Sequence, residues 1–231
     1  MYYFDYAATT PVCGAVAEAM VQALTQRFGN PSSQYPLGRE ARDAVAAQRA
    51  VIAAALDCDP ADLFFTSCGT ESDNWAIQAA LHYGRHRGRH IVTTAVEHSA
   101  VLESCKFLAQ QGVEVTYLKP DRAGRITAAQ VLDAVREDTV LVSVMAVNNE
   151  TGNCYPIAEI AQGLHEKKSG ALLHTDAVQA FMKLPFSARR CGADLVSVSA
   201  HKIGGPKGTG ALYIRSDLHG KIIPLLHGGG Q

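Results

Sequence analysis

The chain has 231 residues, of which 47% are hydrophobic and 19% are charged, so it is long enough to bury the core of one large domain or slightly more. Its 21 basic and 22 acidic side chains nearly cancel, which gives no reason to expect a nucleic acid or an anionic membrane as a partner. No segment has the uninterrupted apolar length that a bilayer span needs.

Apolar, β-branched runs alternate with alanine-rich segments of helical spacing. In chain order we expect a helix over 38–56, a strand over 62–67, a helix over 70–83, a strand over 90–96, a helix over 98–111, a strand over 113–118, a helix over 127–137, a strand over 139–147, a helix over 156–168 and strands over 171–176, 193–200 and 210–215. Several of these strands are continuously apolar, as strands buried on both faces are. The alternation predicts an α/β fold with a mostly parallel seven-stranded sheet flanked by helices.

The segment after the first strand has the signals of a helix start. The turn Cys68-Gly69 precedes Thr70, and Asp73 follows three residues later, a pattern typical of a helix cap. The sequence therefore predicts a strand, a tight turn and a helix amino terminus in succession.

The two ends of the chain carry little targeting information. The start, MYYFDYAATT, lacks the basic and apolar regions of a secretory signal, so we expect a cytoplasmic protein. The end, LLHGGGQ, is a glycine run that closes a domain poorly, and we expect a chain truncated at its carboxyl end. The six cysteines are scattered without the paired spacing of a zinc site, and no metal is expected.

Polar residues gather at the ends of the predicted strands, which is where open α/β sheets bind ligands. They are Gly69 and Thr70, Glu97 and His98, Asn148 to Glu150, Asp176 and Gln179, and Ser199, His201 and Lys202. A lysine in this position suggests an amine that forms an imine with a carbonyl compound.

The residues around this lysine suit pyridoxal 5′-phosphate (PLP). Asp176 can serve as the acid that stays ionised beside the pyridinium nitrogen. Gly69 and Thr70 offer a helix amino terminus and a hydroxyl to the phosphate, and Ser199 and His201 can add donors.

Eight motifs in order then carry a resemblance. They are YFDYAATTP (3–11), FGNPSS (28–33), FFTSCGTESDN (64–74), EHSAV (97–101), VNNETG (147–152), HTDAVQ (174–179), SVSAHKIGGPKGTGALYIR (197–215) and HGGGQ (227–231). With these motifs the chain resembles the class V, fold type I PLP enzymes, and among them the cysteine desulfurases, over essentially its whole length.

The resemblance implies roles at the cofactor ring. Lys202 would form the imine with PLP, His98 would stack on the ring, and Asp176 would bind the ring nitrogen. Gln179 and Asn149 would contact the ring hydroxyl oxygen or the substrate, although both could instead hold loop backbone in place.

The resemblance also implies how the phosphate and the substrate are held. Thr70, Ser199 and His201 would bind the phosphate together with the backbone of Gly69. Asn30 would help to orient the substrate carboxylate.

For the whole chain, the resemblance implies an amino-terminal arm over 1–15, part of the small domain in the family, and a PLP-binding large domain over 16–231, with the second domain largely absent. The expected reaction converts L-cysteine to L-alanine and passes the sulfur as a persulfide to an acceptor protein for iron–sulfur cluster or thio-cofactor synthesis. The family acts as a homodimer. Its nucleophilic cysteine lies beyond the HGGGQ motif, so this chain is expected to lack it.

Two alternatives stay open. One is a selenocysteine lyase or another class V PLP lyase or aminotransferase, which would share nearly every motif. The other is a catalytically incomplete fragment that binds PLP or only dimerises. Cys68 lies in the turn before the expected helix and is the present cysteine nearest to the expected site, but isolated cysteines are usually structural.

Overall fold

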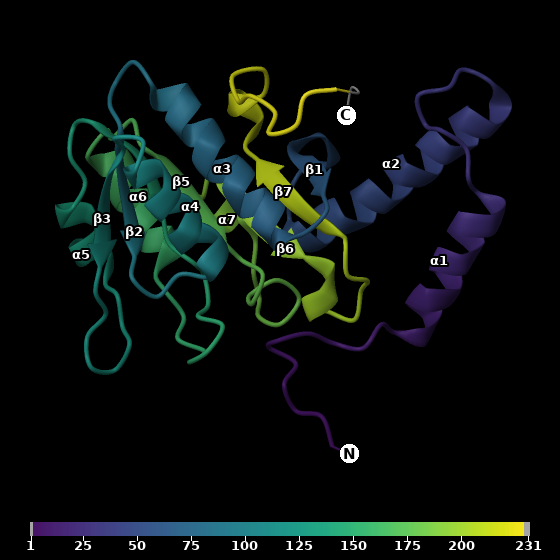
Figure 1. Cartoon of the computed structure of the whole chain (residues 1–231), viewed down its shortest axis with the longest axis horizontal. Coiled ribbons are helices and arrows are strands. Elements are labelled where there is room, and N and C mark those ends of the chain that lie inside the picture. The colour runs from purple at the N-terminus through teal and green to yellow at the C-terminus, as the bar shows by residue number, and fades with distance from the viewer. Residues whose placement is uncertain (1, 229–231) are drawn as a thin grey trace.

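The computed structural model describes residues 2–228 and confirms the α/β architecture (Figure 1). The strands are β1 (Leu63–Thr66), β2 (His90–Thr94), β3 (Glu114–Leu118), β4 (Thr139–Ser143), β5 (Leu172–Asp176), β6 (Leu195–Ser199) and β7 (Gly210–Ile214). The helices are α1 (Gly14–Gln26), α2 (Pro36–Leu56), α3 (Gly69–Gly84), α4 (Ser99–Ala109), α5 (Ala128–Asp133), α6 (Ile157–Glu166) and α7 (Ala188–Cys191), with short 3-10 turns η1 (Pro60–Asp62), η2 (Ala200–Lys202) and η3 (Ser216–Leu218). All seven expected strands are present.

The strands form one sheet in the order β1-β7-β6-β5-β4-β2-β3. The pairs β2–β3, β2–β4, β4–β5 and β5–β6 are parallel, whereas β7 runs antiparallel to both of its neighbours. The sheet is therefore mostly parallel, as expected. Six strands end at the same edge, so the loops that follow them meet there.

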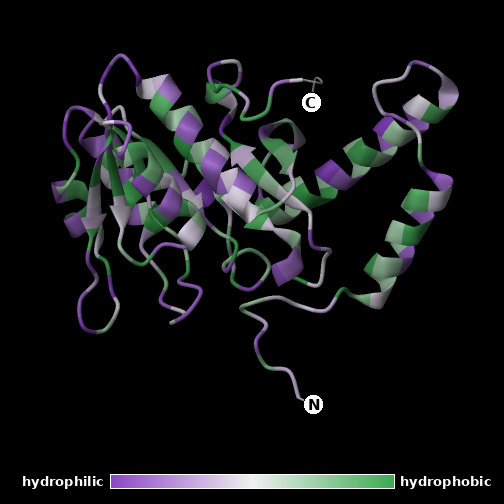
Figure 2. Cartoon of the chain, in the orientation of Figure 1, coloured by the Kyte–Doolittle hydropathy of each residue, from purple (hydrophilic) through white to green (hydrophobic). Residues whose placement is uncertain are grey.

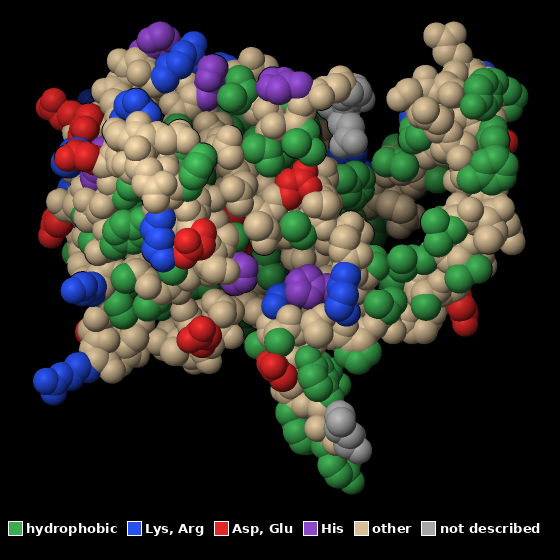
Figure 3. Space-filling view, in the orientation of Figure 1, with side chains coloured by type: hydrophobic (Ala, Val, Ile, Leu, Met, Phe, Trp, Pro, Cys, Tyr) green, Lys and Arg blue, Asp and Glu red, His purple; other side chains and the backbone are tan. Residues whose placement is uncertain are grey.

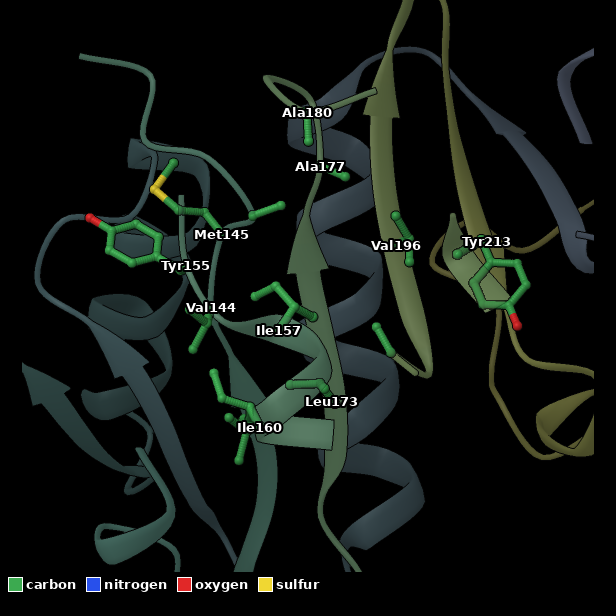
Figure 4. Packing of buried hydrophobic residues seen from close by; sticks show 14 of the residues in the cluster. Val144, Met145, Tyr155, Ile157, Ile160, Leu173, Ala177, Ala180, Val196 and Tyr213 are labelled. Atoms are coloured by element: carbon green, nitrogen blue, oxygen red, sulfur yellow. The ribbon is translucent and has the colours of Figure 1, made fainter. Parts of the chain in front are cut away.

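Both faces of the sheet are covered. Ile91, Leu141, Leu172 and Leu195 pack on the side of α3 and α4, while their chain neighbours Val92, Val142, Leu173 and Val196 pack on the side of α5 and α6. Figure 4 shows Leu173 of β5 against Ile157 and Ile160 of α6. Because successive side chains of a strand point to opposite faces, continuous apolar runs are what a sheet buried on both faces requires.

Residues 14–35 lie apart from this core. Helix α1, which the sequence analysis did not anticipate, has no buried residue, and it projects with the start of α2 away from the sheet (Figure 1). Figure 2 shows that hydrophobic residues recur along this projection, and Figure 3 shows apolar side chains on its surface. Apolar side chains such as Leu24 are exposed there, as are Tyr2 and Phe4 in the first residues. The proposed division into an arm over 1–15 and a large domain over 16–231 stays a prediction, and the last three residues of HGGGQ lie outside the described part of the chain.

Two expected helix details differ from the structure. The N-cap residue of α3 is Cys68, which makes no side-chain capping hydrogen bond. Glu71, in the first turn, accepts at Oε2 from the Ser67 N–H at 2.8 Å. Thr70 is thus inside the helix and Asp73 is not part of a cap. Among the described residues, no helix combines the length and apolar character needed to cross a membrane.

Candidate active site

A cavity of about 690 Å³ opens at the carboxyl edge of the sheet, where the loops after β1, β2, β4, β5 and β6 converge. Nine residues expected at the cofactor line it: Gly69, Thr70, His98, Asn149, Asp176, Gln179, Ser199, His201 and Lys202. Asn30 is not one of the lining residues. It lies exposed between α1 and α2, where its Oδ1 accepts from the Ser32 N–H at 2.9 Å, and its role toward the substrate stays a prediction.

The amino terminus of α3 closes one side of the cavity. The first N–H groups of an α-helix have no partner within the helix, and their partial positive charge attracts anions. Gly69 opens the helix, and a Cβ there would lie 3.0 Å from Val178 Cγ2 and 3.6 Å from Ser199 Cβ. The glycine thus lets the loops after β5 and β6 come close to the helix terminus.

Ser199 provides an independent sign of a missing polar ligand. Its side chain is 4% exposed, and its Oγ is buried without a hydrogen-bond partner among the described residues. Buried hydroxyls are normally paired, because an unpaired one costs about 1–3 kcal/mol. An anion such as a phosphate, held between Ser199 and the start of α3, would supply the partner, so these residues fit the phosphate of PLP.

Lys202 is half-buried in η2, and its amine is held by the amino-terminal segment. Nζ donates to the carbonyls of Ala7 at 2.6 Å and Ala8 at 2.7 Å. Burial lowers the pKa of Lys202, against the opposing effect of Asp176 and Asp5. A lowered pKa increases the fraction of neutral amine, which is the nucleophilic form.

The same segment is fastened to the loop that carries the lysine. The Thr10 N–H donates to the His201 carbonyl at 2.8 Å, Gly204 N–H donates to Thr10 Oγ1 at 2.8 Å, and Cys13 N–H donates to the Gly204 carbonyl at 2.9 Å. His201 Nδ1 also lies 3.1 Å from Thr9 Oγ1. These hydrogen bonds hold the amino-terminal segment so that Asp5, Ala7 and Ala8 line the cavity.

Asp176 ends β5 at the floor of the cavity and is 5% exposed. Its Oδ1 accepts from the Val178 N–H at 2.9 Å. Burial raises its pKa, and the neighbouring Asp73 carboxylate raises it further. This environment shifts Asp176 toward its protonated form in the protein alone. An ionised Asp176 beside the ring nitrogen of the cofactor stays a prediction.

His98 lies just before α4 and caps that helix. Its Nδ1 accepts from the Ala100 N–H at 3.1 Å, so a neutral ring carries its proton on Nε2. One carboxylate oxygen each of Asp73 and Asp176 and one ring nitrogen of His98 all lie within 4.8 Å of one another. Because the ring nitrogen left over is a donor, this trio suits a hydrogen-bonding ligand, and we assign no metal to it.

Gln179 and Asn149 line the cavity from two further loops. The Gln179 amide donates to the Ala7 carbonyl at 2.8 Å and accepts from Lys183 Nζ at 2.6 Å, so the protein itself orients it. Asn148 forms the turn beside Asn149, since its Oδ1 accepts from the N–H groups of Glu150 and Thr151. Asn149 and Glu150 are the residues of that turn that line the cavity.

The sequence analysis missed several lining residues, namely Asp5, Ala7, Ala8, Asp73, Met145 and Val178. Asp73 was detectable, because it lies three residues after Thr70 and hence on the same face of α3. The alanines contribute backbone carbonyls, which no residue pattern identifies. Cys68 also lines the cavity, at the cap of α3.

Comparison with known proteins agrees with this arrangement. The family model for aminotransferase class-V matches residues 2–231. The chain is 47% identical over 229 residues to a cysteine desulfurase IscS of Methanosarcina thermophila and 48% identical to a putative cysteine desulfurase IscS 1 of Bacillus subtilis. In both cases the match covers 99% of this chain, but 56% and 59% of the relatives.

Solved structures show the same likeness. A NifS-like protein superposes with a TM-score of 0.94 at 42% identity, over 99% of this chain and 62% of the other. A structure described as SspA in complex with cysteine gives a TM-score of 0.94 at 41% identity, over 100% of this chain and 66% of the other. The chain thus spans a little more than half the length of the curated relatives it matches, and it belongs to the aminotransferase class-V family.

Proposed function

We propose that this chain is the cofactor-binding part of a PLP-dependent cysteine desulfurase, which converts L-cysteine to L-alanine and passes the sulfur to an acceptor protein. PLP is the cofactor of the family to which the chain belongs. The observation that carries the proposal is the single cavity in which Lys202, Asp176, His98 and the start of α3 meet. The names of the relatives supply the substrate class.

Each of these residues has a task in such a reaction. When bound, PLP withdraws electrons from the α-carbon of an amino acid. Lys202 would hold the cofactor and then move the α-proton, for which its lowered pKa is suited. His98 presents the N–H of Nε2 to the cavity, and Ser199 with the start of α3 would hold the phosphate.

A homodimer and a cytoplasmic location belong to the same proposal. The exposed apolar side chains Val21, Leu24 and Phe28 in and beside α1 support an association with a second copy, since they have 60%, 74% and 70% of their surface exposed. The sulfur acceptor, and a role in iron–sulfur cluster or thio-cofactor synthesis, are inferred from the family alone.

The first test is reduction with borohydride after incubation with PLP, followed by peptide mapping. The cofactor should be fixed on Lys202, and Lys202→Ala should abolish the label. Lys207→Ala is the matched control, because Lys207 lies exposed in the same glycine-rich loop and does not line the cavity. Labelling spread over surface lysines would refute the cofactor site.

The second test measures alanine released from L-cysteine, with selenocysteine as the competing substrate. Release from cysteine that depends on Lys202 supports a desulfurase. Release from selenocysteine alone would instead support a lyase for that amino acid. A labelled Lys202 without release from either substrate would refute the activity of this chain and leave the cofactor site standing.

A further inference from the structure

Asp73 is a buried carboxylate that the proposed reaction does not use. It lies on the face of α3 that lines the cavity, it is 1% exposed, and its Oδ1 has no hydrogen-bond partner among the described residues. The nearest basic group is the ring of His174, whose Nε2 lies 3.5 Å from this oxygen. A buried carboxylate without a cation is costly, so its position requires an explanation.

His174 does not supply the missing positive charge. Its Nδ1 lies 2.9 Å from Ser143 Oγ and its Nε2 lies 3.0 Å from Ser197 Oγ. Burial lowers the pKa of His174 to about 4, so the ring is neutral at physiological pH. Asp73 therefore faces a neutral imidazole.

Asp73 and Asp176, which we call the carboxylate pair, have oxygens within 4.8 Å of each other. Two carboxylates at such a separation in a buried site cannot both ionise easily, because each negative charge opposes the other. We propose that the carboxylate pair holds one proton between its two members, and that the pair, rather than Asp176 alone, receives the nitrogen of the cofactor ring.

The charges around the pair agree with a single negative charge. Besides His174, the titratable groups that face it are Glu97 and His98 from the start of α4 and Lys202 from η2, and Asp5 of the amino-terminal segment faces Lys202. Burial raises the pKa of Glu97 to about 8, so Glu97 is protonated near neutral pH. Lys202 is the ammonium that faces Asp176, and it also faces Asp5, so it cannot offset two negative charges on the pair as well.

The inference rests on the cofactor part of the proposed function, not on the desulfurase reaction. With one proton shared, either aspartate can carry the charge that a protonated ring nitrogen needs. Asp73 would thus be a positioning residue for that nitrogen and a partial substitute for Asp176.

The pair can be tested without cofactor. In the 231-residue chain with ¹³C-labelled aspartate carboxyls, Glu97 is silent, and one aspartate carboxyl should stay protonated until close to neutral pH. In Asp73→Asn and in Asp176→Asn, the remaining aspartate loses its like-charged neighbour and should release its proton at least about one pH unit lower. Glu71→Gln, which neutralises α3 outside the cavity, should leave the titration unchanged.

Two results would overturn the shared proton. If the remaining aspartate titrates at the wild-type pH in both single variants, the two carboxyls do not share a proton. The wild-type titration decides alone if a variant fails to fold: absence of any aspartate carboxyl that is protonated above about pH 5 would overturn the proposal.

Cofactor affinity supplies the second readout and needs no turnover. Each single variant keeps one carboxylate, so its dissociation constant for PLP, measured by absorbance titration, should rise less than about tenfold. Asp73→Asn/Asp176→Asn removes the charge and should weaken binding by about a hundredfold or more. A complete loss of binding in Asp176→Asn with an unchanged Asp73→Asn would assign the ring nitrogen to Asp176 alone.

Discussion

Burial of Glu97 lowers the free energy of unfolding as the pH rises, and an isosteric substitution should remove this loss. The side chain is 5% exposed, and its Oε1 accepts from Thr94 Oγ1 at 2.7 Å and from the Met145 N–H at 3.0 Å, while Oε2 is buried without a partner among the described residues. Burial raises its pKa from the ordinary value of 4.5 to about 8. Glu97→Gln keeps the accepting oxygen and resembles the protonated acid.

The sign follows from the direction of the shift. Because the folded pKa lies above the unfolded one, the wild type has its full stability below pH 4.5 and loses it progressively as the pH rises to about 8. The loss is about 3 kcal/mol near pH 7 and about 5 kcal/mol near pH 9, at about 1.4 kcal/mol per pKa unit. Glu97→Gln should be more stable than the wild type by these amounts, and nearly equal to it at about pH 4.5.

Urea unfolding of both proteins at about pH 5, 7 and 9 measures the difference. The contributions of the other buried acids to the pH dependence cancel in this difference, since both proteins contain them. Glu103→Gln on the exposed face of α4 is the control and should give a small, pH-independent difference, because Glu103 forms an exposed ion pair with Lys106. A stability difference for Glu97→Gln that stays constant from pH 5 to pH 9 would refute the reasoning.

Three further predictions concern the frame of the site. Ser199→Ala removes an unpaired buried hydroxyl, so it should stabilise the cofactor-free chain by about 1 kcal/mol but weaken PLP binding about tenfold. Thermal melts with and without PLP measure both effects, and a lower stability without PLP would contradict the prediction. His98→Ala removes the cap of α4 and should lower the free energy of unfolding by about 1 kcal/mol, with His98→Asn restoring most of it in urea titrations, whereas equal losses in both would argue against capping. Gly210→Ala places a Cβ 2.8 Å from the Cys68 carbonyl carbon and 2.9 Å from the Val198 oxygen, so it should lower the free energy of unfolding by at least about 2 kcal/mol in urea titrations. A urea midpoint equal to that of the wild type would show that the neighbouring backbone shifts to accommodate the methyl group.

The sheet could be predicted from the sequence because its signal is local. Runs such as those around Val92 and Leu173 are apolar at successive positions, which only strands covered on both faces require. The sequence analysis missed helix α1, although Val16, Met20, Val21 and Leu24 recur in it at helical spacing; none of them is buried in the structure. The strand-end rule also located the cavity, since it depends only on where each strand stops.

The rest of the site depends on contacts that no local pattern encodes. Asp73 was taken for part of a helix cap because the spacing of three residues that makes a capping pattern also places two residues on one helix face. The pKa of Asp176 is raised by burial and further by Asp73, which lies on another element about a hundred residues earlier in the chain. The carbonyls that hold Lys202 come from Ala7 and Ala8, whose side chains carry no chemical signal.

That last contact has a consequence for how the molecule is made. Ala7 and Lys202 are 195 residues apart, so this contact can form only after the whole stretch between them has been synthesised. Contacts between such distant residues form slowly, because the loop between them must be ordered or closed first. We therefore expect the contact between Lys202 and this segment to form late in folding, with the lysine amine accessible to solutes before that.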